Sequence, residues 1–563
     1  MSSSGCESLI RMTQSSNATA VLPQLTPAGA TGAPALVRPV PLWARLFMPS
    51  IADVFFAALL FRLTFWGQHL LDDADIGWHI RNGQHILTTH AVPRADYFSY
   101  TMSGQPWYAW EWLYDVMVAG IHAVAGLNGV VLFSACLVAL VFALLFRLAL
   151  KASGNLLVAL CLTLLAGAAS LIHLLARPHL VTWLFTLVFF QALASFQRGE
   201  RKQLLFLPAL MLLWVNLHGG FLVGIAVLGL FIAANLWTRL TAAGAELRGQ
   251  AQARLRHLGM VMALTLAATM VTPYGYRLYV HLHDYLGSGY LMDHIAEFQS
   301  PDFHLLQIKA FAVLLIAALL APALGRVKAS ALDLLVMAFS AWVALYAVRN
   351  LPIASILLTL TAAPMLGTAL SRLTEDGEMA PWMRRLAAKV DGYSTRMGVM
   401  EQKFKGHALA AMMLAAVVGL AVLGASSPGK GLALQFDAKR VPVQAAEYMA
   451  AHNIRDHFYA PDDWSGYLIY RLYPDVRVMM DDRHDFYGEK YVRDFLRVAQ
   501  VSYGWREVLD AKQVNWVLIP PTSPLASTLK ETRDWKVVHD DGTAILFERT
   551  APLAVQGTDQ GPR

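Results

Sequence analysis

The chain has 563 residues, of which 56% are hydrophobic and 15% charged, and its formal net charge is +6. A soluble protein would carry about a quarter charged residues, so the composition excludes an ordinary soluble enzyme. The basic residues are spread over short loops between apolar runs, which excludes a nucleic-acid-binding surface and is typical of membrane topology.

The three cysteines predict neither a disulfide framework nor a cysteine metal site. Cys136 and Cys161 lie inside apolar runs and Cys6 lies near the N-terminus, so no pairing is evident. We interpret them as small hydrophobic side chains.

Residues 1–45 are rich in Ser, Ala, Thr and Pro and predict a disordered cytoplasmic tail. They lack the basic region, apolar core and cleavage site of a signal peptide. Residues 551–563 predict a second disordered tail.

Apolar segments of about 20 residues then predict a polytopic α-helical membrane domain over residues 46–427. We expect about eleven transmembrane helices, at residues 47–68, 128–148, 155–175, 180–197, 203–217, 219–238, 257–273, 309–325, 330–348, 351–370 and 408–425.

The loop charges predict the orientation of these helices. With the N-terminus inside, the inner loops hold eighteen Lys and Arg residues and the outer loops only five: Arg81, Arg94, Arg177, Arg277 and Arg349. The positive-inside rule therefore predicts a cytoplasmic N-terminus, and an odd number of spans places the C-terminal region outside.

The first outer loop, residues 69–127, is the richest in polar residues. Asp75 precedes a helical pattern on which Asp75, Trp78, His79 and Asn82 share one face. Asp72, Asp73 and Asp75 are candidate ligands for a divalent cation such as Mg²⁺ or Mn²⁺, or one of them is a general base. The alternative is a helix cap with two solvated loop acids.

Other outer loops also carry polar groups close to the membrane boundary, where they usually face a protein interior or a cavity. Together with the first loop, they supply the candidate substrate-binding residues: His79, Trp78, Arg94, Asp96, Glu111, Arg177, His179, Asn216, His218, His294, Glu297 and Arg349. Paired Arg donors suit a phosphate group, so a substrate with a lipid tail and a phosphate headgroup is indicated.

Residues 428–550 predict a small soluble α/β domain. Its expected strands are residues 476–481, 515–520, 535–540 and 543–549, with helical stretches between them, and Asp541-Gly542 predicts a β-hairpin. Residues Asp481–Asp485 lie at the C-terminal end of the first of these strands and form either a binding site or a solvated loop. Residues 464–466 are expected to form a turn.

Seven segments, in chain order, carry a resemblance to a known family: DDADIGWHIRNGQHIL, VPRADYFSYTMSGQPWYAWEWL, LARPHL, NLHGG, TPYGY, IAEFQSPDF and WSGYLIYRLYPDVRVMMDDRHDFYG. With them, the chain resembles a bacterial branch of the GT-C superfamily of membrane glycosyltransferases. The resemblance covers most of residues 47–550.

This resemblance implies a GT-C-like fold and transfer of a sugar from a polyprenyl-phosphate-linked donor to an envelope glycan, lipid or protein. It also implies the periplasmic face of the bacterial inner membrane. The essential acid of such enzymes, carried over by position, is Asp75, with Asp73 as second choice. Ile76 follows Asp75 where several of those enzymes have a Glu.

Two other functions stay open at this point. One is a transporter or flippase for a lipid-linked substrate, although no internal repeat is visible. The other is a non-catalytic scaffold in polysaccharide assembly.

Overall fold

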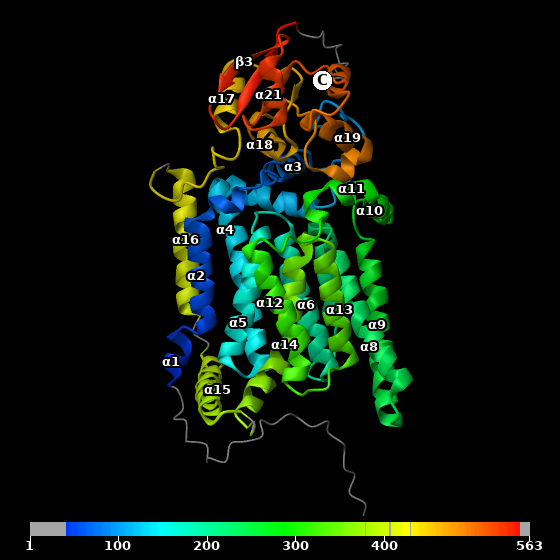
Figure 1. The fold of residues 1–563 in the computed structure, drawn as a ribbon, viewed down its shortest axis with the longest axis vertical. Coiled ribbons are helices and arrows are strands. Elements are labelled where there is room, and N and C mark those ends of the chain that lie inside the picture. The colour runs from blue at the N-terminus through cyan, green and yellow to red at the C-terminus, as the bar shows by residue number, and fades with distance from the viewer. Residues whose placement is uncertain (1–40, 376, 378, 405–406, 428, 552–563) are drawn as a thin grey trace, which may run out of the picture.

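The computed structural model describes residues 41–551 except 376, 378, 405, 406 and 428. Figure 1 shows a long helix bundle with a smaller α/β part seated on one end. We call this the domain-side end; α1 (Leu42–Phe47) and α15 (Pro381–Glu401) lie at the opposite end. The predicted disordered tails lie almost wholly outside the described residues.

Six helices are long and apolar enough to cross a membrane, which makes this a multi-pass membrane protein. They are α4 (Trp112–Ser153), α6 (His179–Gln197), α8 (Phe221–Thr241), α12 (Leu306–Leu324), α14 (Leu351–Leu373, counted from Val348) and α16 (Ala408–Ser426).

Every other predicted span also contains a helix, so the helical character of all eleven segments is confirmed. These helices are α2 (Ile51–Phe65), α5 (Leu156–Ala169), α7 (Phe206–Leu217), α9 (Ala245–Thr269) and α13 (Ala331–Tyr346). That all eleven cross the membrane stays a prediction.

The bundle is organised around α14, which packs against α4, α5, α12 and α13. Ile356, Leu357 and Leu358 are successive residues of α14 and all are fully buried. A helix that is apolar on all sides is expected at the centre of such a bundle.

At the domain-side end the chain forms short elements that cover the bundle. They are η1 (Gly67–Leu71), α3 (Ile76–Thr89), η2 (Leu171–His173), α10 (Arg277–Gly287), α11 (Gly289–His294), η3 (Ala296–Phe298) and η4 (Val348–Asn350).

The C-terminal part has helices α17 (Val443–Ala451), α18 (Asp462–Leu472), α19 (His484–Ala499), α20 (Trp505–Ala511) and α21 (Pro524–Glu531). Its strands β1 (Phe458–Tyr459), β2 (Trp516–Ile519), β3 (Trp535–Asp540) and β4 (Ile545–Arg549) form a sheet in the order β1-β2-β4-β3. β1 runs parallel to β2, and the other neighbours are antiparallel.

Three of the four predicted strands are confirmed, as is the hairpin, where Gly542 has a φ of +81°. The predicted strand 476–481 is wrong. Val478 instead exchanges backbone hydrogen bonds with Phe98 and Tyr100 of the α3–α4 connection. The predicted turn at 464–466 is also wrong, since these residues lie within α18.

Two glycines seat the C-terminal part on α3. A Cβ on Gly77 would overlap the backbone oxygen of Gly466, and a Cβ on Gly466 would overlap that of Ala74. Only glycine permits this approach of α18 to α3. The contact fixes the C-terminal part directly above the acidic residues that precede α3.

Candidate functional site

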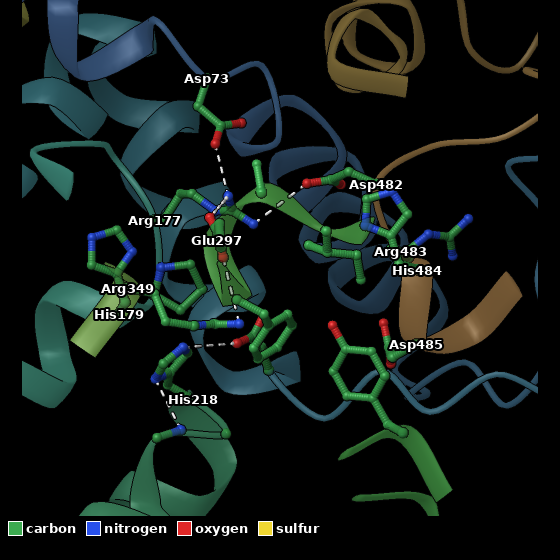
Figure 2. A pocket seen from close by; sticks show the side chains of 18 of the residues that line it. Asp73, Arg177, His179, His218, Glu297, Arg349, Asp482, Arg483, His484 and Asp485 are labelled. Atoms are coloured by element: carbon green, nitrogen blue, oxygen red, sulfur yellow. Dashed lines mark hydrogen bonds and ion pairs between the residues drawn. The ribbon is translucent and has the colours of Figure 1, made fainter. Parts of the chain in front are cut away.

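A cavity of about 1020 Å³ lies between the bundle end and the C-terminal part. Figure 2 shows ten of its polar side chains, which come from both parts of the molecule: Asp73, Arg177, His179, His218, Glu297, Arg349, Asp482, Arg483, His484 and Asp485. The sequence regions predicted to lie on one face therefore converge on one space.

Arg177 is the centre of an acidic group that we call the Arg177 cluster: Arg177 with Asp73, Asp75, Glu297 and Asp482. The guanidinium nitrogens lie 2.7 Å from Asp73 Oδ2, 2.7 Å from Asp75 Oδ2, 3.0 Å from Glu297 Oε1 and 3.4 Å from Asp482 Oδ2. Four carboxyl groups surround one guanidinium, and three of them, Asp73, Glu297 and Asp482, line the cavity (Figure 2), so acid is in excess beside it.

Burial of this group changes its protonation. Burial, with the charges of Asp482 and Asp73, raises the pKa of Asp75 well above its ordinary value, and burial also raises the pKa of Asp482. Burial works against ionisation of Glu297 too, but the charges of Arg177 and Arg349 outweigh it and hold that pKa below its ordinary value. The cluster is therefore suited to hold a proton between Asp75 and Asp482.

Asp75 occupies the position before α3, but its side chain makes no helix-capping hydrogen bond. Its carboxyl group faces Arg177 and is only 1% exposed. The side chain of Asp73, by contrast, is 21% exposed and lines the cavity.

The acids best placed for a cation differ from the predicted set. Asp73, Asp75 and Asp482 bring one oxygen each to within 4.8 Å of one another. Asp72 does not join them, because its Oδ2 lies 3.0 Å from both His69 Nδ1 and Arg440 Nη1. Three carboxylates fit a hard divalent cation in chemistry, and here they surround the guanidinium of Arg177.

A second carboxyl group, Glu111, lines the cavity next to two histidines. Its oxygens lie 3.9 Å from His79 Nε2 and 3.6 Å from His218 Nε2. Behind His79, its Nδ1 is 2.6 Å from Asp115 Oδ1, and Asn82 donates to the same carboxyl group. Of the predicted face of α3, His79 and Asn82 thus bind Asp115, whereas Trp78 lines the cavity.

No protein-family model matches this chain, and no curated protein matches it. Among solved structures, the chain is similar to the crystal structure of ArnT from Cupriavidus metallidurans bound to undecaprenyl phosphate. The identity is 15% and the TM-score 0.44, over 91% of this chain and 99% of that chain.

The remaining predicted binding residues divide into two groups. Trp78, His179, His294 and Arg349 line the cavity, with His179 Nε2 bonded to the backbone oxygen of His173. His294 is largely exposed.

Arg94, Asp96 and Asn216 do not line this cavity, so the structure does not bring them together with the other predicted binding residues. Arg94 is exposed and donates to the backbone oxygen of Pro273. Asp96 is buried against Arg483, and Asn216 accepts a hydrogen bond from Trp112.

Asp115 and Thr182 were not singled out from the sequence. Asp115 follows Glu111 by four residues at the start of a helical run, so it could have been placed on the same helix face as Glu111. Thr182 binds His218, and nothing local in the sequence signals that contact.

Proposed function

We propose that this chain is a membrane glycosyltransferase that moves a sugar from a polyprenyl-phosphate-linked donor to a cell-envelope acceptor. The observation that carries the proposal is the convergence of acids and arginines on one cavity at the end of an apolar bundle. The lipid tail of such a donor is apolar and its headgroup carries both phosphate and hydroxyl groups. The proposal includes the predicted periplasmic position of this end.

Arg349 is the arginine best placed to bind the phosphate. Its side chain is 32% exposed and its one ion pair in the described chain, with Glu297, is 3.5 Å long. Arg177 is already shared by four carboxyl groups, so we assign it to positioning them. His218 lies on the same side of the cavity, where its Nε2 faces Glu111 at 3.6 Å (Figure 2).

The cavity walls suit a sugar. Trp78, Trp107, Tyr108, Trp110 and Tyr285 line it beside the acids. Aromatic rings with a few placed polar groups are the usual composition of sites for small ligands. Carboxylates such as Asp73 accept hydrogen bonds from hydroxyl groups.

The two candidate catalytic acids have different roles in this proposal. Asp73 lines the cavity and contacts the substrate. Asp75 has almost no exposed surface, so it acts as a positioning residue through Arg177 and Asp482.

A divalent cation, if bound, would be held by Asp73, Asp75 and Asp482. It would supply positive charge to stabilise the phosphate that leaves when the sugar is transferred. Arg349 supplies positive charge in the same cavity from the chain itself.

The test compares cells that lack the gene and are complemented with the wild type, Asp75→Asn or, as control, Glu489→Gln. Glu489 is exposed and pairs with Arg493 in the C-terminal part. Mass spectrometry of envelope glycans and lipid-linked sugars, at matched protein levels, should show one decoration lost and its donor accumulated in Asp75→Asn alone.

If Asp75→Asn restores the wild-type profile, the proposal fails for this residue and Asp75 is structural. If deletion of the gene changes no decoration at all, the chain is not a transferase. A transporter or a scaffold then becomes the preferred function.

A further inference from the structure

Glu111 differs from the acids of the Arg177 cluster because it has no ion pair with an arginine among the residues that the structure describes. It lies just before α4 and its side chain is 13% exposed to the cavity. In the part of the chain that the structure describes, its recorded ion pairs are with two histidines, one at each carboxyl oxygen: His79 at Oε2 and His218 at Oε1.

The hydrogen bonds of His218 fix which ring nitrogen carries its hydrogen. Nδ1 accepts the backbone N–H of Gly220 at 3.0 Å. Thr182 Oγ1 lies 2.7 Å from the same Nδ1 and accepts the indole N–H of Trp214, so its own hydroxyl hydrogen points to His218. Burial lowers the pKa of His218 to about 3, so the ring is neutral and its hydrogen sits on Nε2, facing Glu111.

His79 has the opposite arrangement. Its Nδ1 lies 2.6 Å from Oδ1 of Asp115, and Asn82 donates to Oδ2 of the same carboxyl group. An ionised Asp115 can only accept hydrogen bonds, so with Asp115 ionised Nδ1 carries the hydrogen. Burial lowers the pKa of His79 to about 3. The Nε2 lone pair of a neutral His79 therefore faces Glu111.

Glu111 is thus placed between a donor and an acceptor. As a carboxylate it is matched to the N–H of His218, and as a carboxylic acid it is matched to the lone pair of His79. Both protonation states of Glu111 therefore have a hydrogen-bond partner in the site, as a residue that gains and loses a proton during a reaction requires. The distances of 3.6 and 3.9 Å leave room for the group to tighten on a substrate, as catalytic groups do when a ligand binds.

Resting on the function proposed above, we propose that Glu111 is the catalytic base that accepts the proton of the acceptor hydroxyl group. The acceptor oxygen bonds to the anomeric carbon of the sugar, and the bond from that carbon to the phosphate oxygen breaks. Its electron pair stays on the polyprenyl phosphate, and the hydroxyl proton moves to Glu111.

Asp73 is less suited to this step, because its carboxylate is already paired with the guanidinium of Arg177 at 2.7 Å. Burial, and then the charge of Asp115, raise the pKa of Glu111 well above its ordinary value, and Asp485 acts in the same direction. Arg177 and Arg349 act against them. These groups, with His79, His218 and Tyr114, are the recorded charged or titratable groups that face Glu111.

The test uses membranes from the complemented cells, which contain the full chain, their own lipid-linked sugars and the envelope acceptor. Mass spectrometry follows the transfer rate from pH 5 to pH 8.5 and the lipid-linked sugar that copurifies with the protein. The variants are Glu111→Gln and Glu111→Asp, with Glu489→Gln as control.

We expect Glu111→Gln to lower the transfer rate by about 100-fold or more while it retains the copurified donor. The wild-type rate should fall as the pH decreases and Glu111 becomes protonated. Glu111→Asp should keep part of the rate and shift the pH at which it falls. If Glu111→Gln does not fold, the changed pH dependence of Glu111→Asp tests the proposal instead.

The outcomes separate the two proposals. Absence of any transfer in wild-type membranes overturns the proposed function. Transfer in the wild type that persists unchanged in Glu111→Gln, or an unchanged pH profile in Glu111→Asp, overturns the assignment of Glu111. Loss of the donor from Glu111→Gln also overturns it, because the residue then binds the substrate instead of accepting a proton.

Discussion

Two arginines in this molecule are each surrounded by acids, and their surroundings differ. Arg483 forms a buried group, the Arg483 cluster, in which it pairs with Asp96 at 2.7 Å and with Asp481 at 2.7 Å. Tyr487 donates to Asp481, and the ring of Trp107 lies 4.4 Å from the guanidinium carbon. The Arg177 cluster has four carboxyl groups and borders the cavity.

The difference lies in charge balance and access. In the Arg483 cluster, Asp96 also accepts hydrogen bonds from Phe98 and Ser99, so both carboxylates are satisfied within the protein. In the Arg177 cluster, four acids share one guanidinium, against two in the Arg483 cluster, and two of the four have raised pKa values. The same residue types therefore hold the molecule together in one place and are available to a ligand in the other.

The largest expected effect is on folding. Arg483→Leu would leave Asp96 and Asp481 buried without their cation, which typically costs about 3–5 kcal/mol. Thermal unfolding in detergent should show a large loss of stability. The control is Arg477→Leu, which removes an exposed arginine bonded to Ser103. An equal loss in both variants would show that Arg483 is not a structural centre.

In the Arg177 cluster we expect loss of activity without loss of stability. Asp482→Asn removes one of the crowded acids, so the melting temperature should stay the same or rise. Transfer should fall by about 100-fold, equivalent to about 2.7 kcal/mol of activation free energy. A lower melting temperature with unchanged specific activity would place Asp482 with the structural residues.

A smaller effect is expected for the proposed phosphate contact. Arg349→Gln should raise the KM for the lipid-linked donor by about tenfold, equivalent to about 1.4 kcal/mol. Arg94→Gln, in an exposed arginine outside the cavity, should leave that KM unchanged. Equal effects of the two substitutions on this KM would show that Arg349 does not bind the donor through its place in the cavity.

The smallest effect is expected for Asp72, which precedes Asp73 but belongs to neither cluster. Its partner Arg440 is 53% exposed, and such a pair contributes about 1 kcal/mol or less. Asp72→Asn should shift the melting temperature slightly and leave the transfer rate within about twofold. A loss of transfer as large as that of Asp482→Asn would extend the Arg177 cluster to this residue.

The helices were predictable because an apolar run of sufficient length is a local property of the sequence. The gathering of Arg177, His218, Glu297 and Arg349 was also indicated, since each lies at a loop on the same predicted side. The order of the predicted membrane helices determines on which side of the membrane each loop lies. That these four residues lie on the same side could therefore be inferred without knowing how the helices pack.

Contacts made by the docking of the C-terminal part were not predictable in this way. Residues 476–481 have the composition of a strand, but Val478 pairs with the α3–α4 connection instead of the sheet. The meeting of Asp482 with Asp75, and the burial of Asp96 against Arg483, depend on how α18 seats on α3. One sequence contains no local signal of that geometry.

The glycine contact between Gly77 and Gly466 also has a consequence for biogenesis. The first acids of the site leave the ribosome early, whereas Asp482 is made after every membrane helix. Until the last fifth of the chain is synthesised and seats on α3, Asp73, Asp75 and Glu297 stand at the end of an uncovered bundle. Insertion into the membrane and completion of the site are therefore separate events in the life of each molecule, and a chain cut short after α16 has its helices but an open site.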